Sequence, residues 1–278
     1  MSNELHLNRP NPAVVHAGGE SLSVRRFGRG ERRLMMLHGG PGLDHQILLP
    51  LADRLAERYQ VWLPDLPGHG GSLKDGEKLP GADSLRRRMA SWVSGLIRDG
   101  TGPDLLCGHS LGAWLARDLV RNGSVAPEAL VLISPPSRPA RGEPSSSDTE
   151  FGRAREEWLR YLQVEVPGPM SDQFRQAALD TLIVPPSRYI RLLRTLQRIL
   201  MNRPESFAPG CPVLVLVGEM DRTTTPKQAA EIARRTGGAL LRRLPDCGHF
   251  PWAEDAEPTA SAIDRFFRGQ FRGQQPKP

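Results

Sequence analysis

The sequence predicts an α/β protein with a mostly parallel, doubly wound sheet and a helical cap inserted into it. Two observations lead to this prediction. Over most of the 278 residues, short apolar runs alternate with amphipathic segments of helical length, which is typical of a parallel sheet covered by helices. The alternation stops after Ile133 and resumes at Val213, so the segment between them is expected to be an insertion.

The strands and helices of the expected sheet domain can be placed along the chain. Apolar runs predict strands at Leu34–Leu37, Gln60–Leu63, Leu105–Cys107, Leu130–Ile133, Val213–Val217 and Leu240–Leu244. Amphipathic segments predict helices at Gln46–Arg58, Ser84–Arg98, Leu111–Asn122, Lys227–Thr236 and Pro258–Phe271. The apolar runs are nearly continuous, so we expect strands buried on both faces. Residues 13–28 predict a hairpin about Gly18-Gly19, at an antiparallel edge of the sheet.

The insertion is expected to be a helical cap over residues 136–205, and residues 1–135 and 206–278 form the predicted core domain. Residues 136–149 are rich in Pro, Ser and Gly and predict a linker. Three helical patterns follow without a strand, at about 149–164, 171–183 and 187–201. An insertion at this position would lie over the crevice where open α/β sheets bind ligands.

Composition excludes several classes of protein. The chain is 38% apolar and 24% charged, as soluble globular proteins are, and no stretch approaches the 18 apolar residues of a membrane-spanning helix. The N-terminus lacks the pattern of a signal peptide, so a cytoplasmic location is expected. The net charge of +6 comes from scattered arginines, and the three cysteines show no metal-ligand spacing. We expect a small-molecule substrate, no nucleic-acid or membrane partner, and a monomer or homodimer.

The stretch LLCGHSLGAW, residues 105–114, predicts a nucleophile at Ser110. A G-x-S-x-G pattern between a strand and a helix is typical of a sharp turn that exposes the serine. Gly108 and Gly112 permit that turn because they carry no side chain. The N–H of Leu111, at the start of the helix, is the predicted first donor to an oxyanion. A surface serine in a glycine-rich turn is the alternative.

The loop HGGPG, residues 38–42, follows another predicted strand and offers further backbone donors. Gly40 is the predicted second oxyanion donor, with Gly39 as the alternative. His38 is expected to hold the loop through its ring nitrogens rather than act as a base. In LPDLPGHGGS, residues 63–72, Asp65 and His69 are interpreted as parts of a turn stabilised by aspartate hydrogen bonds.

A serine nucleophile needs a base and a group that orients the base. Asp221 lies just past the end of a strongly apolar strand, and it is preferred to Glu219 as the acid. His249, in the loop after the last predicted strand, is the predicted base. Asp246, on the same loop as His249, is a weaker candidate for orienting it.

The segments HGGPG, DLPGHGGS, GHSLG, GEMD and CGHFPWAEDAEP resemble, in this order, the landmark segments of enzymes with the α/β-hydrolase fold. The resemblance spans roughly residues 20–135 and 206–270. It implies a serine hydrolase in which Ser110, Asp221 and His249 form a catalytic triad, and which requires no metal or organic cofactor.

The motifs resemble branches of the fold that cleave different types of bond. HGGPG resembles the proline iminopeptidase branch, but Leu111 stands where members of that branch often have tryptophan, and GHSLG resembles esterases. We therefore expect cleavage of a carboxylic ester, thioester or lactone of a small or medium substrate. An aminopeptidase, a carbon–carbon bond hydrolase and a small-molecule receptor of the same fold are the alternatives.

Aromatic side chains are expected to line the substrate pocket. The candidates are Trp114, Trp158, Tyr161 and Trp252. An aminopeptidase would also need carboxylates in the cap to hold the amine of its substrate. The available ones fit equally well as solvated helix faces: Glu156, Glu157, Glu165, Asp172 and Asp180.

Overall fold

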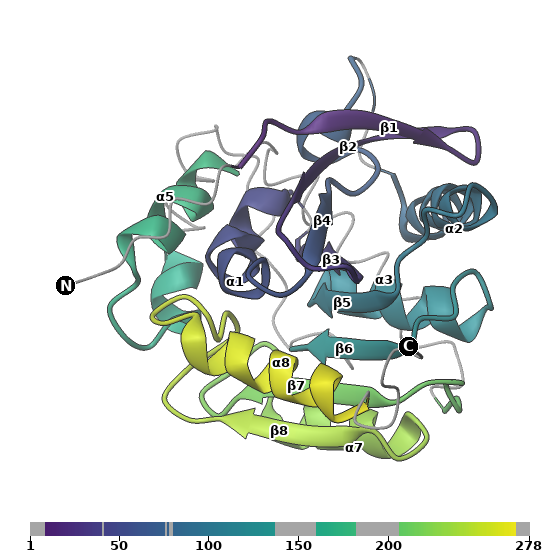
Figure 1. Cartoon of the computed structure of the whole chain (residues 1–278). Helices are drawn as coiled ribbons and strands as arrows, with labels where there is room; N and C mark the ends of the chain where they lie inside the picture. The colour runs from purple at the N-terminus through teal and green to yellow at the C-terminus, as the bar shows by residue number, and fades with distance from the viewer. Residues whose placement is uncertain are drawn as a thin grey trace.

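The computed structural model describes residues 9–40, 42–75, 77, 80–136, 160–181 and 206–270. Its centre is an eight-stranded sheet in the order β1-β2-β4-β3-β5-β6-β7-β8 (Figure 1). The strands are β1 (Ala13–Ala17), β2 (Glu20–Phe27), β3 (Arg33–Leu37), β4 (Gln60–Pro64), β5 (Leu105–His109), β6 (Ala129–Ile133), β7 (Val213–Gly218) and β8 (Leu240–Leu244). The β1–β2 and β2–β4 pairs are antiparallel and all other pairs are parallel, which confirms the predicted sheet.

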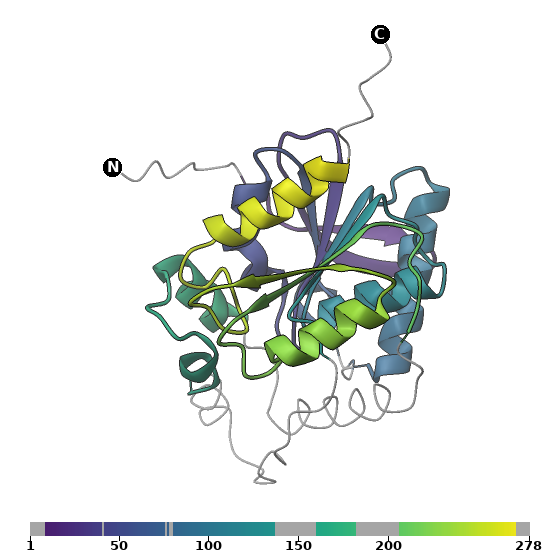
Figure 2. The same cartoon turned by 90° about the horizontal axis from the view of Figure 1, so that it is seen from below.

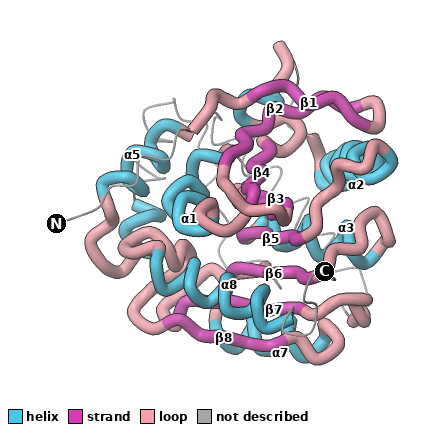
Figure 3. Tube along the Cα trace, in the orientation of Figure 1, coloured by secondary structure: helices cyan, strands magenta, loops and turns pink. Residues whose placement is uncertain are grey.

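Helices cover both faces of this sheet, as Figure 2 shows with the sheet nearly edge-on. The helices described over their whole length are η1 (His45–Leu48), α1 (Leu49–Leu55), η2 (Gly70–Ser72), α2 (Ala82–Arg98), α3 (Leu111–Arg121), α5 (Asp172–Asp180), α7 (Pro226–Arg235) and α8 (Glu257–Gln270). Helices α1 and α8 pack on one face, and α2, α3 and α7 pack on the other (Figures 1 and 3). None of these described helices is long and apolar enough to cross a membrane.

Alternation of side chains along the strands divides the core into two layers. In β5, Leu105 and Cys107 join the layer with α1 and α8, and Leu106 joins the layer with α2 and α3. Both faces of a central strand are therefore apolar, which explains the continuous apolar runs. The expectation of burial on both faces is wrong for β8, where Leu240 is 59% exposed, because β8 is the edge strand.

Two local predictions can be compared directly with the structure. The hairpin about Gly18-Gly19 is confirmed: both glycines have positive φ, and β1 is the edge strand. The helix expected at Gln46–Arg58 is shorter, because a 3-10 turn precedes α1 and α1 ends at Leu55. Pro50 lies in the first turn of α1, where its missing N–H has no helical partner to lose.

The predicted cap is described in part. Residues 160–165 are helical and α5 follows them, within the ranges expected for the first two cap helices. Helix α5 packs beside η1 and α1 and buries Phe174. The expected third helix and nearly all of the linker lie outside the described residues, and the division into core and cap stays a prediction.

The loops with candidate functional residues meet at one edge of the sheet. In the parallel register Leu37 is opposite Gly108, His109 is opposite Ile133, and Gly218 is opposite Leu244. The residues that follow these strands therefore leave the sheet side by side, at the edge where ligands bind in open α/β sheets.

Three buried histidines make the stability of the fold depend on pH. Burial lowers the pKa of His38 to about 3, lowers that of His69, and lowers that of His109 well below its ordinary value. In the unfolded chain these side chains take up a proton below about pH 6.5, whereas in the folded chain the lowered pKa values move proton uptake to lower pH. Each one therefore lowers the free energy of unfolding by up to about 1.4 kcal/mol per pH unit below that value.

We expect the free energy of unfolding to fall steeply between pH 6.5 and pH 4. Urea unfolding at pH 7, 6 and 5 measures this fall. A His69→Gln variant should show a shallower slope, because one of the three protons is removed from the unfolded state. A free energy of unfolding that stays constant from pH 7 to pH 5 would contradict the assignment of three neutral buried histidines.

Candidate active site

Ser110 occupies a strained turn between β5 and α3. Its backbone has φ 49° and ψ −114°, in a region that residues with side chains rarely adopt. The Ser110 N–H donates to the Ile133 carbonyl at 2.9 Å, and the Ser110 carbonyl accepts the Trp114 N–H at 3.0 Å. The turn is thus fixed by the neighbouring strand on one side and by the helix on the other.

The two glycines of the G-x-S-x-G pattern are required by close packing. A Cβ at Gly112 would lie 2.1 Å from the Leu37 carbonyl oxygen, and a Cβ at Gly108 would lie 2.3 Å from the Gly112 carbonyl oxygen. Both contacts are with backbone atoms that cannot turn aside. The pattern therefore marks a place where α3 approaches β3 and β5 too closely for any side chain.

A Gly112→Ala substitution is expected to lower the free energy of unfolding by about 1–3 kcal/mol, the usual cost of overpacking. Urea unfolding measures the loss. Gly81→Ala is the matched control, because a Cβ at Gly81 meets no atom within 4 Å. The packing explanation would be wrong if the two variants were equally stable.

The HGG segment lies directly against the serine turn. His38 donates from Nδ1 to the Gly39 carbonyl at 2.6 Å and accepts the Leu66 N–H at Nε2 at 3.0 Å, which confirms its structural role. A Cβ at Gly39 would lie 3.4 Å from Ser110 Cβ, and a Cβ at Gly40 would lie 3.8 Å from Leu111 Cδ2. Gly40 stays the predicted oxyanion donor, with Gly39 as its alternative.

The structure brings His249 and Asp221 together. Nδ1 of His249 lies 3.1 Å from each oxygen of the Asp221 carboxylate, and both side chains are buried. Oδ1 of Asp221 also accepts the Thr224 N–H at 2.7 Å, which orients the carboxylate. Glu219 and Asp246, the other acids considered, are exposed. Asp221 is thus the preferred acid by geometry as well as by position in the sequence.

His109 connects the histidine loop to the serine turn, a role that the sequence did not indicate. Its Nε2 donates to the His249 carbonyl at 2.9 Å, and the two rings are 4.9 Å apart. Burial lowers its pKa, so the ring is neutral and Nε2 carries the proton. Because His109 immediately precedes Ser110, this bond fixes the His249 loop relative to the serine.

Of the two interpretations that the sequence left open for Glu165, a carboxylate that holds an amine or a solvated helix face, the structure rules out the solvated face. Only 4% of the residue is exposed. Its carboxylate accepts the Thr223 hydroxyl at 2.8 Å and the Arg222 N–H at 3.2 Å. The helical turn over residues 160–165 packs against the loops that follow β7 and β8, and this packing buries the side chain.

The aromatic residues considered for a pocket lie at different depths. The Tyr161 hydroxyl is 3.1 Å from Thr223 Oγ1, and its ring centre is 6.5 Å from that of His249. Trp252 is fully buried, donates from Nε1 to the Ile47 carbonyl and packs edge-on against His109. Trp114 is buried, and Trp158 lies outside the described residues. Their contact with a substrate stays a prediction.

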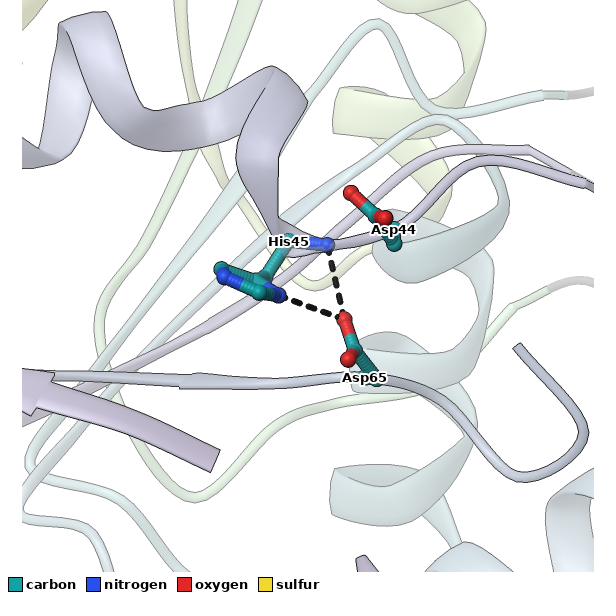
Figure 4. Close-up of side chains that lie close together, drawn as sticks. All are labelled: Asp44, His45 and Asp65. Carbon is teal, nitrogen blue, oxygen red and sulfur yellow. Dashed lines mark hydrogen bonds and ion pairs between the residues drawn. The ribbon is translucent and has the colours of Figure 1, made fainter. Parts of the chain in front are cut away.

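A second buried histidine–aspartate pair braces the loops beside the site (Figure 4). Asp65 Oδ1 accepts the His45 backbone N–H at 2.9 Å and its Nδ1–H at 2.7 Å, and Arg25 Nε donates to His45 Nε2. Burial raises the pKa of the adjacent Asp44. Burial would also raise the pKa of Asp65, but the hydrogen bonds from His45 outweigh it and hold that pKa below its ordinary value. Asp65 is therefore architectural, as predicted.

Two groups of buried side chains in the described part of the chain have the spacing of metal ligands. They are Asp44, His45 and Asp65, and Glu165, Asp221 and His249. In the first group both ring nitrogens of His45 are engaged, one with Asp65 and one with Arg25. In the second, His249 Nδ1 is bonded to Asp221 and the Glu165 oxygens to residues 222 and 223. Hydrogen bonds within the protein account for both groups.

A family model described as the alpha/beta hydrolase family matches residues 34–262. The chain belongs to this family. The match covers every segment of the site described above, from the HGG segment to the His249 loop. The predicted fold class is thereby confirmed.

Relatives of this alpha/beta hydrolase include proteins named pimeloyl-[acyl-carrier protein] methyl ester esterase. The one from Aromatoleum aromaticum is 28% identical over 257 residues, which cover 85% of this chain and 98% of the relative. The one from Nitrosospira multiformis is 25% identical and covers 90% and 100%. The hydrolase therefore has relatives that cleave esters, which supports the prediction of ester cleavage.

Solved structures show the same fold. A serine hydrolase involved in carbazole degradation superposes with a TM-score of 0.73 at 19% identity, covering 92% of this chain and 98% of that one. A thermophilic esterase superposes with a TM-score of 0.72 at 22% identity, covering 95% and 98%. At these identities the likeness concerns the architecture of the alpha/beta hydrolase and carries no statement about its substrate.

Proposed function

We propose that this alpha/beta hydrolase is a serine esterase that cleaves a carboxylic ester, thioester or lactone of a small or medium substrate through an acyl-enzyme on Ser110. The observation that carries the proposal is the buried His249–Asp221 pair at the same sheet edge as the Ser110 turn. A histidine whose Nδ1–H is held by a carboxylate presents Nε2 as a base, which is what a serine nucleophile needs.

In the proposed reaction, His249 Nε2 takes the hydroxyl proton of Ser110 as Oγ attacks the ester carbonyl carbon. Asp221 holds the ring in the Nδ1–H tautomer and stabilises the imidazolium that forms. His249 then gives the proton to the departing alkoxide, and the acyl group stays on Ser110. Water, activated by the same histidine, hydrolyses the acyl-enzyme and regenerates Ser110.

The N–H groups of Leu111 and Gly40 are the proposed donors to the oxyanion of the tetrahedral intermediate. Leu111 is the first residue of α3, so its N–H has no partner within the helix and lies at the positive end of the helix dipole. Gly40 lies against Leu111 across the serine turn. Removal of one such donor in other enzymes costs about 2.7–4 kcal/mol of transition-state stabilisation.

Ester cleavage is preferred to the alternatives because the named relatives are methyl ester esterases. Tyr161 is the proposed substrate contact with the most direct support, since its ring lies beside His249. Trp114, Trp158 and Trp252 complete the proposed pocket. No metal or organic cofactor takes part in these steps, and the proposed substrate is a small molecule.

The test is to label the wild-type protein with a fluorophosphonate probe and to measure turnover of p-nitrophenyl butyrate, methyl octanoate and proline p-nitroanilide. We expect stoichiometric labelling and faster turnover of the esters than of the anilide. Faster turnover of the anilide would indicate an aminopeptidase instead. A protein that reacts with neither the probe nor any of the three substrates would contradict the proposal and favour a receptor of this fold.

A further inference from the structure

Glu165 contacts two loops: the acid loop, which follows β7 and carries Asp221, and the base loop, which follows β8 and carries His249. Its carboxylate accepts the Arg222 N–H and the Thr223 hydroxyl, which belong to the two residues that follow Asp221. Its backbone carbonyl accepts the His249 N–H at 3.0 Å. One residue of the turn over 160–165 therefore ties together two loops that follow different strands.

We propose that Glu165 is a positioning residue for the Asp221–His249 pair, an inference that rests on the proposed function. One carboxylate oxygen of Glu165, one of Asp221 and a ring nitrogen of His249 lie within 4.8 Å of one another. Glu165 acts through these loops: its hydrogen bonds go to residues 222, 223 and 249. It is therefore distinguished from a residue that binds the substrate.

The packing around Glu165 leaves little room for the loops to shift. A Cβ at Gly248 would lie 2.0 Å from the Glu165 carbonyl oxygen, so the base loop lies directly against this turn. The backbone of His249 is held at both ends, by Glu165 at its N–H and by His109 at its carbonyl. Of these two residues, Glu165 also bonds to the Asp221 loop through its side chain.

A backbone hydrogen bond also joins the acid loop and the base loop, at a different point from the contacts of Glu165. The Met220 N–H donates to the Cys247 carbonyl at 3.0 Å and joins the loops ahead of Asp221. Glu165 holds the segment behind Asp221. The Thr223 hydroxyl also lies 3.1 Å from the Tyr161 hydroxyl, so the segment has two contacts with the same helical turn. The segments before and after Asp221 are therefore both held, and removal of the Glu165 carboxylate weakens the hold on the segment after it.

Loss of this support should slow the reaction more than it weakens substrate binding. Misplacement of a catalytic group by about 1 Å can cost about 10²-fold in rate. A residue that only positions other groups lowers kcat and leaves KM nearly unchanged. We expect Glu165→Ala to lower kcat for p-nitrophenyl butyrate by about 10- to 100-fold, with KM within about threefold of wild type.

Glu165→Gln is the conservative variant. Its amide oxygen can accept the Arg222 N–H, and its amide nitrogen can donate to Thr223 Oγ1, so both links are kept. We expect kcat within about fivefold of wild type. Glu254→Gln is the matched control: this half-buried carboxylate lies on the same loop as His249, but it accepts the Gly168 N–H rather than a group of the Asp221 loop. It should leave kcat unchanged.

Should Glu165→Ala fail to fold, Thr223→Val tests the same contact, because it removes the hydroxyl that donates to the Glu165 carboxylate. Its kcat should fall by about 3- to 10-fold with KM unchanged. In the double variant with Glu165→Gln, kcat should stay close to that of Thr223→Val alone, because the glutamine keeps the link to the Arg222 N–H and the Thr223 contact is already broken.

The results that would contradict the role of Glu165 are different from those that would contradict the proposed esterase function. The inference is wrong if Glu165→Ala keeps wild-type kcat, if its loss falls on KM alone, or if Glu254→Gln loses as much. NMR of the His249 Nδ1 proton reports the bond to Asp221 without any substrate. Loss of that resonance in folded Glu165→Ala supports the inference even if the wild-type protein proves inert toward esters, and an unchanged resonance overturns it.

Discussion

Replacement of Ser110 with alanine is expected to lower kcat for p-nitrophenyl butyrate by about 10⁴- to 10⁶-fold and to abolish fluorophosphonate labelling. The alanine side chain has no oxygen to attack the ester, while the His249–Asp221 pair and the proposed oxyanion donors stay in place. Alanine tolerates the positive φ of Ser110 about as well as serine does, so the fold should be kept. Steady-state kinetics and intact-mass analysis of the probe-treated protein measure the two effects.

Ser134→Ala is the matched control for this substitution. Ser134 has positive φ, as Ser110 does, and it is a buried residue that follows β6, the strand beside β5. Its hydroxyl has no hydrogen-bond partner in the part of the chain that the structure describes. We expect activity within about threefold of wild type. A Ser110→Ala protein that keeps more than a tenth of the activity, or that is labelled like wild type, would rule out Ser110 as the nucleophile.

Asp221→Asn should lower kcat by about 10³- to 10⁴-fold and leave the fold intact. The carboxylate accepts from His249 Nδ1 at both oxygens, so it requires the proton to be on Nδ1. The asparagine amide can donate to Nδ1 and thereby place the proton on Nε2, where it blocks removal of the Ser110 proton. Steady-state kinetics with p-nitrophenyl butyrate, together with circular dichroism, separates loss of the base from loss of the fold.

Glu219→Gln is the control for Asp221→Asn. Glu219 is exposed, two residues earlier on the same loop, and was the alternative acid in the sequence. We expect its activity to match that of wild type. Equal losses in the two variants, or less than a tenfold loss in Asp221→Asn, would show that Asp221 does not hold the base in the required tautomer.

The sequence alone predicted the features that depend on residues close together in the chain, namely the central strands and the turns that follow them. Continuous apolar runs identified the central strands because these strands are covered on both faces. Gly108 and Gly112 marked the serine turn because only glycine fits between the backbones of β3, β5 and α3. The place after a strand reduced the candidate acids on this loop to Glu219 and Asp221, since parallel strands bring their following loops to one edge.

The tertiary structure decided which side chains meet across those loops. Glu165 looked like any polar residue of an amphipathic helix, yet it contacts Arg222 and Thr223, 57 and 58 residues away. The His45–Asp65 pair spans 20 residues and has no periodic signal. Burial and turn formation are set by near neighbours in the chain and leave a pattern in the sequence. Pairing of polar groups between loops depends on how strand ends stack in the sheet, and only the folded chain determines that.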